Sequence, residues 1–109
     1  MSTKYLYLFG YESPAEFRSN ADARTDFESS AGVWISGASE EQALRWGRSV
    51  AEHFVAWLFE RSGNEPYSWA AAQFADWIET DPSVQKAAAN FPIVAIGELP
   101  DFASLEPQA

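Results

Sequence analysis

The segment Lys4–Tyr11 constrains the fold more than any other part of the sequence. Read as a strand, it places four aromatic rings on one face and two leucines on the other. Because both faces are apolar, we expect an interior strand that is covered on two sides. An open edge of this composition would pair with other chains, so the segment must lie centrally in a sheet or pair across a dimer.

The next strong pattern predicts a helix from Glu40 to about Arg61. Ser39 is suited to cap its first turn, with Gln42 reaching back to the cap. Apolar residues recur at helical spacing and form one broad face, which indicates burial against a sheet and a further element. That face comprises Ala43, Gly47, Val50, Ala51, Phe54, Val55 and Leu58. Gly47 is expected to allow close approach of Trp34 or of a later helix.

The other elements are shorter. Ser13-Pro14-Ala15-Glu16 resembles a helix start, and we expect only a short turn there. The polar residues 18–32 are expected to form a long irregular loop, in which a functional site or a mobile segment is common. Later elements are predicted as a strand at 33–37, a helix at 68–80 with Trp77 in the core, a short helix at 82–89, a strand at 93–96, and a tail at 100–109 held by Phe102 and Leu105.

Together these elements predict a single α+β domain over residues 1–109. The expected architecture is a small sheet of three to four strands with a long central helix. One or two further helices pack mainly on one face. If strands 33–37 and 93–96 are parallel neighbours, the connection between them should be right-handed. A fourth strand is expected near residues 26–30.

The composition of the chain disfavours several classes of partner and of chemistry. The chain has 16 acidic and 7 basic residues and a formal net charge of -9. This balance disfavours nucleic acid and anionic membranes as partners, because both bind clustered Lys and Arg. No apolar run is long enough for a membrane span, and no signal peptide is apparent. The absence of cysteine excludes disulfides and thiolate chemistry and fits a cytoplasmic protein.

The sequence has no recognisable catalytic motif or metal-binding spacing. His53 is the only histidine, and the sequence supplies no partner that would make it a general base. Asp22, Asp26 and Glu28 form an acidic cluster of the kind that binds Ca²⁺ or Mg²⁺, but their spacing is not that of an EF-hand. The glycines form no nucleotide-binding motif. We therefore expect no catalytic residue, no metal and no cofactor.

The aromatic content is unusual, at 16% with five tryptophans. Tryptophan is enriched in interface hot spots, yet small domains also use it to fill a core. Trp46 and Trp57 lie at the edge of the apolar face of the long helix, with His53 beside them. We expect these three residues to form a partner-binding patch, and Asp22, Asp26 and Glu28 to steer a basic partner toward it.

The run from Val33 to Leu44 resembles the strand–cap–helix junction of many small bacterial α+β domains, including HicB-like antitoxins. The leading hypothesis is a small acidic, non-enzymatic protein-binding domain of bacterial type, such as an immunity-like or inhibitor protein for a basic partner. One alternative is a homo-oligomeric structural module, for instance a homodimer. Another is a small enzyme or ligand carrier that uses the loop 18–32.

Overall fold

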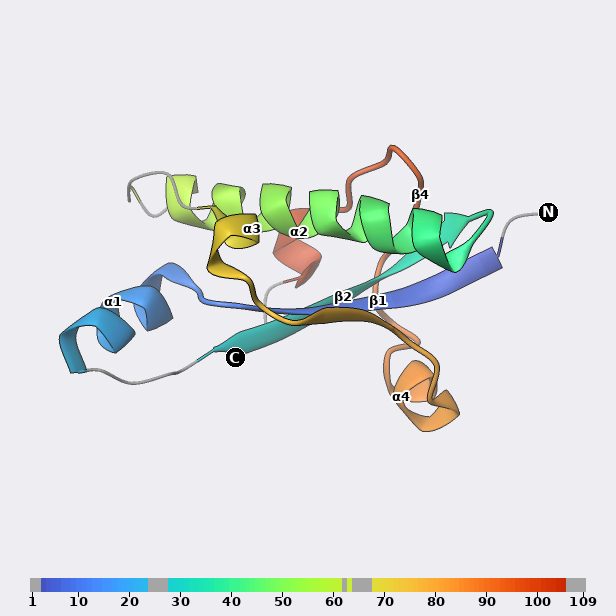
Figure 1. The fold of residues 1–109 in the computed structure, drawn as a ribbon, viewed down its shortest axis with the longest axis horizontal. Helices are drawn as coiled ribbons and strands as arrows, with labels where there is room; N and C mark the ends of the chain where they lie inside the picture. Colours follow the sequence, from blue (N-terminus) through green and yellow to red (C-terminus); the bar gives the residue numbers. More distant parts are fainter. Residues whose placement is uncertain (1–2, 24–27, 62, 64–67, 106–109) are drawn as a thin grey trace.

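The computed structural model describes residues 3–23, 28–61, 63 and 68–105. It is an α+β fold in which helices pack against a four-stranded mixed sheet (Figure 1). The elements in chain order are β1 (Thr3–Tyr11), α1 (Pro14–Ala23), β2 (Ser29–Gly37), α2 (Glu40–Arg61), α3 (Trp69–Ala72), β3 (Asp76–Glu79), α4 (Pro82–Ala87), β4 (Ile93–Ala95) and the 3-10 helix η1 (Phe102–Leu105).

The sheet has the strand order β3-β1-β2-β4. β1 pairs antiparallel with β2 along its whole length and antiparallel with β3 through Leu6–Phe9. The interior position predicted for this aromatic strand is therefore confirmed. β2 and β4 are parallel neighbours, with Trp34 opposite Ile93. β4 adds only three residues to the sheet, so most of β2 lies beyond its reach.

One face of the sheet carries the main hydrophobic core. Tyr7 and Phe9 of β1 are fully buried beneath α2, which lies along this face in Figure 1. The Phe9 ring packs edge-on against the rings of Phe54 and Trp69, with centroid separations of 6.1 and 5.8 Å. Aromatic rings of this size bury large areas and favour such tilted contacts. The aromatic strand and the long helix thus form one core.

The long helix has the bounds that its capping pattern predicts. The Ser39 hydroxyl accepts a hydrogen bond from the Gln42 backbone N–H, and the Gln42 side chain accepts one from the Ala38 N–H. The prediction that Gly47 lies against Trp34 or a later helix is wrong. A Cβ on Gly47 would lie 2.5 Å from ring atoms of Tyr7, so this glycine allows β1 and α2 to approach each other closely.

The predicted helix at 68–80 is wrong beyond its first turn. Ser68 caps α3 as expected, but the helix ends at Ala72 because Gln73 adopts a left-handed conformation with φ of 59°. The chain then pairs with the free edge of β1, starting where the Gly10 N–H donates to the Ala75 carbonyl. The hydrogen bonds between the paired strands β1 and β3 therefore outweigh the helical pattern of the local sequence. As a result Trp77 is 42% exposed rather than part of the core.

The prediction of an irregular loop at residues 18–32 is also mostly wrong. α1 continues to Ala23, and β2 begins at Ser29 because its first residues pair with Phe9–Tyr11 of β1. Of the extra strand that we expected near residues 26–30, residues 29 and 30 belong to β2, and residues 26 and 27 lie outside the described residues. The fourth strand is β3 instead.

The end of the described chain follows the sequence prediction more closely. The Asp81 side chain accepts a hydrogen bond from the Ser83 N–H and begins α4, with Pro82 in the first turn. Phe102 packs against the ring of Trp57 at 5.7 Å, and Leu105 is buried. Among the helices of the described ranges, none combines the length and apolar composition needed to cross a membrane.

Candidate functional site

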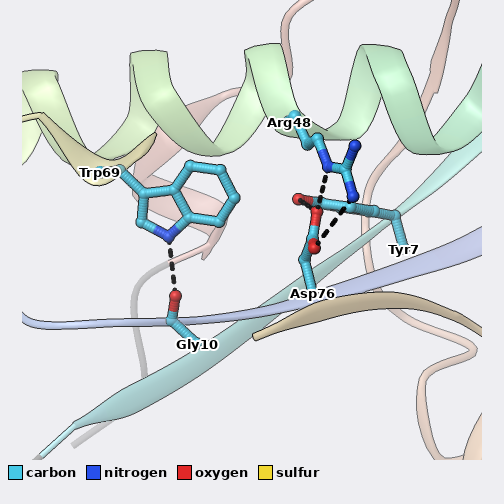
Figure 2. A network of polar contacts seen from close by, with 5 residues as sticks. All are labelled: Tyr7, Gly10, Arg48, Trp69 and Asp76. Carbon is cyan, nitrogen blue, oxygen red and sulfur yellow. Dashed lines mark hydrogen bonds and ion pairs between the residues drawn. The ribbon is translucent and has the colours of Figure 1, made fainter. Parts of the chain in front are cut away.

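Two surface regions stand out, one at each face of the sheet. The first is a polar cluster where β1, α2 and β3 meet, beside the single turn of α3 (Figure 2). The second is an apolar hollow on the opposite face, between the sheet and α4. In Figure 1 α4 lies below the sheet while α2 lies above it.

The polar cluster is centred on the carboxylate of Asp76. The Tyr7 hydroxyl donates to Asp76 Oδ2 at 2.9 Å. Arg48 Nε donates to the same oxygen at 2.9 Å, and its Nη2 lies 3.5 Å from Oδ1. The side chain of Asp76 is only 12% exposed, whereas that of Arg48 is 57% exposed. One carboxylate therefore links a core tyrosine to a surface arginine (Figure 2).

The electrostatics of this cluster favour a structural role. Burial, followed by the hydrogen bond to Asp76 and the negative charge of that carboxylate, raises the pKa of Tyr7 well above its ordinary value. The hydrogen bond from Arg48 to Asp76 likewise raises the pKa of the guanidinium. Tyr7 thus keeps its proton and remains a donor, while Arg48 keeps its charge. The three groups join β1, α2 and β3.

A shallow hollow of about 180 Å³ lies beside this cluster, lined by Arg48, Trp69, Ala70, Gln73, Phe74 and Asp76. Its floor is fixed by Trp69, which is buried and donates its indole N–H to the Gly10 carbonyl at 2.8 Å. Figure 2 shows this bond and the Asp76 contacts on the same side of β1. The hollow is small and open, so it suits a contact surface better than an enclosed ligand site.

The apolar hollow on the other face has a volume of about 240 Å³. It is lined by Leu8, Ser30, Ala31, Trp77, Val84, Ala87, Ala88 and Phe91. Phe91 rests against Gly32, where a Cβ would lie 2.7 Å from its ring, and the Trp34 indole donates to the Ala88 carbonyl at 2.9 Å. These contacts hold α4 and the segment after it against the sheet.

Large apolar side chains remain exposed around this hollow. Trp77 is 42% exposed and Phe91 is 37% exposed. Ile93, which lies on the edge strand β4 opposite Trp34 and does not line the hollow, is 54% exposed. Single exposed hydrophobic residues are ordinary, but two exposed aromatic rings that line an apolar hollow are typical of a candidate interaction surface. We call Leu8, Trp77, Val84, Phe91 and Ile93 the α4-side surface.

The three predicted anchor residues of α2 each have contacts within the chain. Trp46 is half-buried and donates its indole N–H to the Glu98 carbonyl at 2.8 Å. Trp57 is half-buried against Phe54, and the Arg61 guanidinium lies 4.3 Å from the centre of its ring. His53 is exposed, with Nδ1 2.7 Å from the Ser49 carbonyl oxygen. Their role in partner binding stays a prediction.

The predicted acidic residues are placed as follows. Asp22 is exposed near the end of α1, and Glu28 is exposed directly before β2. Asp26 lies outside the described residues. Within the ranges that the structure describes, no three His, Asp or Glu side chains are placed to hold a metal ion. Steering of a basic partner by these acids also stays a prediction.

Sequence reasoning missed both candidate regions. Asp76 lies 69 residues from Tyr7 and 28 from Arg48, so no local spacing links them. The prediction that Trp77 lies in the core follows from the predicted helix at residues 68–80. Its place on a strand would have followed from the β-prone pair Trp77-Ile78 before the Asp81-Pro82 helix start.

Comparison with known proteins adds no assignment: no family model, no curated protein and no solved structure matches this chain. Its function must therefore be argued from its own surfaces.

Proposed function

We propose that this chain is a small, acidic, non-enzymatic protein-binding domain, such as an immunity-like or inhibitor protein, that binds a basic partner protein. The α4-side surface is the proposed contact. The observation that carries the proposal is the partial exposure of Trp77 and Phe91 beside an apolar hollow. Aromatic anchors of this kind supply much of the energy of protein interfaces.

The hollow gives the partner a defined role. An apolar side chain of the partner enters between Trp77 and Phe91 and covers Leu8, which is half-buried in the free protein. Burial of such surface contributes about 25 cal/mol for each Å² removed from water. The polar cluster of Asp76 on the opposite face ties the sheet to α2 and keeps the surface in place.

The net negative charge of the chain supports a basic partner. The chain carries a net charge of -9. Glu79 and Asp81 lie at the end of β3 and the start of α4, next to the α4-side surface. An acidic protein attracts a basic target over distance and raises the rate of association, an effect that salt weakens. The cytoplasm remains the expected compartment, since a chain without cysteine fits a reducing environment.

Affinity capture from native lysate tests this proposal with matched variants. The wild type and Phe17→Ala, which removes a ring on α1 that is 44% exposed, should recover the same stoichiometric partner. Phe91→Ala and Trp77→Ala should each reduce its recovery by about tenfold or more. Higher salt should lower recovery by the wild type as well. Equal recovery by all four proteins, or no stoichiometric partner at either salt concentration, would refute the proposal.

The same exposed surface also favours a second candidate, a homodimer in which two copies cover each other's α4-side surface. Static light scattering after size exclusion distinguishes the two. A strict monomer at high concentration excludes the dimer. A dimer that Phe91→Ala converts to a monomer would replace the hetero-partner in the leading proposal.

A further inference from the structure

The outer edge of β3 carries backbone groups that point away from the sheet. The Gly10 N–H donates to the Ala75 carbonyl at 2.9 Å, and Leu8 pairs with Trp77. In an antiparallel ladder, hydrogen-bonded residues alternate with residues whose N–H and C=O point the other way. Ala75, Trp77 and Glu79 therefore face β1, while Asp76 and Ile78 direct their peptide groups outward.

These outward groups have no backbone partner among residues 3–23, 28–61, 63 and 68–105. β3 is an edge strand of the sheet, and in Figure 1 it passes in front of β1. A row of free N–H and C=O groups on an edge is a template for another strand. At four residues the edge is short, so it suits one short segment rather than a long ribbon.

The two faces beside this edge differ in chemistry. On the α4 side lie Trp77, 42% exposed, and the half-buried Glu79. On the α2 side lie Asp76, paired with Arg48, and the shallow hollow that includes Phe74. An added strand would place alternate side chains on these two faces. Its residue opposite Trp77 gains an aromatic cross-strand neighbour, and its residue opposite Glu79 lies beside a carboxylate.

A second copy of this chain fits the edge poorly. Antiparallel self-pairing of so short a strand would bring Glu79 and Asp81 of both copies close together, between two bodies that each carry a charge of -9. Like charges across a strand pair are destabilising. A strand with basic residues removes this repulsion.

We propose that the outer edge of β3 accepts an extended segment of a protein partner as an added antiparallel strand, with Lys or Arg opposite Glu79 and an apolar residue opposite Trp77. This inference rests on the proposed function, since it specifies how a basic protein partner is bound. Main-chain hydrogen bonds to Asp76 and Ile78 supply affinity, and the two side-chain pairs supply selectivity.

The test uses a synthetic peptide with blocked ends and the sequence Thr-Lys-Thr-Val-Thr-Lys-Thr, added to the full chain. Amide hydrogen exchange is followed by NMR. The N–H groups of Asp76 and Ile78 should exchange about tenfold more slowly at saturating peptide, because they become hydrogen-bonded. A matched peptide carries N-methyl groups on its central Thr-Val-Thr residues and should lose this protection. It cannot donate hydrogen bonds to the carbonyl groups of Asp76 and Ile78, so the added strand does not form.

A charge exchange tests the pairing opposite Glu79. Glu79→Lys should weaken binding of the Lys-containing peptide by about tenfold and restore binding of a peptide with Glu in place of Lys. The proposal is overturned if the peptide leaves the Asp76 and Ile78 amides unchanged at millimolar concentration. It is equally overturned if the N-methylated peptide protects them as well.

The two proposals fail in different ways. Phe91 lines the hollow but is not part of the β3 edge. If Phe91→Ala abolishes partner capture while the peptide leaves the β3 amides unprotected, the proposed function stands and the strand-addition site does not exist. If the β3 amides become protected but no partner is captured, the edge proposal stands and the role of the α4-side surface is refuted.

Discussion

The two faces of the sheet are built from the same strands but covered very differently. On the α2 face, Tyr7, Phe9 and Tyr11 are almost entirely buried beneath a helix of 22 residues. On the opposite face, α4 has six residues and leaves Trp77 42% exposed. β1 supplies apolar side chains to both faces, because successive strand residues alternate in direction.

The difference shows that an apolar strand face does not guarantee a closed core. A helix rises 1.5 Å for each residue, so six residues extend over about 9 Å, whereas 22 residues extend over about 33 Å. α4 is thus too short to cover its face of the sheet. The α2 face holds most of the buried apolar side chains, and the α4 face retains more exposed apolar surface.

The largest expected effect comes from truncating the core on the α2 face. Phe54 is fully buried and contacts Phe9 and Tyr11. Phe54→Ala should lower the free energy of unfolding by about 3–5 kcal/mol in urea denaturation. Trp77→Ala, its counterpart on the other face, should cost about 1 kcal/mol, as is usual for an incompletely buried site. Equal losses from the two variants would contradict this difference between the faces.

A second prediction concerns the close contact between α2 and β1. In Gly47→Ala the new Cβ would overlap the buried Tyr7 ring, and overpacking of this kind costs about 1–3 kcal/mol. The variant should therefore be less stable, although alanine favours a helix by about 1 kcal/mol over glycine. Ala56→Gly, at an exposed position of the same helix, calibrates that preference. A stabilised Gly47→Ala variant would show that the contact can relax.

A third prediction tests the link between β3 and the core. Asp76→Ala leaves the Tyr7 hydroxyl without its acceptor, and an unsatisfied buried group costs about 1–3 kcal/mol. Tyr7→Phe in the same background should recover part of this loss in stability, because it removes the hydroxyl that has no hydrogen-bond acceptor. Denaturation of the two single variants and the double variant measures the coupling. Additive losses would mean that the hydrogen bond contributes little.

A fourth, smaller effect is expected at alkaline pH. Since the pKa of Tyr7 is raised in the folded chain, the unfolded chain loses this proton first, above about pH 10. The contribution of Tyr7 to stability is therefore complete below pH 10 and declines as the pH rises further. Stability of the wild type should fall more steeply between about pH 9.5 and 11 than that of Tyr7→Phe. Parallel curves would place the Tyr7 hydroxyl in water.

The smallest effect is expected at the open edge of the α4-side surface. Ile93 is 54% exposed on β4, so Ile93→Ser should change the free energy of unfolding by no more than about 0.5 kcal/mol. Thermal denaturation by circular dichroism measures this. A loss of several degrees in Tm would indicate that the α4 face contributes to the core of the free protein.

Elements with local signals were predictable from the sequence. The aromatic segment of β1, the Ser39 cap of α2 and the Asp81-Pro82 start of α4 are each specified by neighbouring residues. The local sequence predicted the wrong structure where pairing between distant strands determines it. β3 forms because β1 has an open edge beside it, and β2 begins at Ser29 because Tyr11 lies opposite. The candidate regions depend on these two strands, so sequence reasoning did not find them.

The sequence by itself determined the α+β class, the interior strand, the long amphipathic helix and the acidic charge, because each follows from periodicity, capping or composition. Only the tertiary structure decided which apolar residues remain outside the core. Trp77 and Asp76 are adjacent in the chain yet point to opposite faces, one to the open hollow and the other to the buried hydroxyl of Tyr7. That outcome depends on strand pairing between distant segments, which local sequence does not encode.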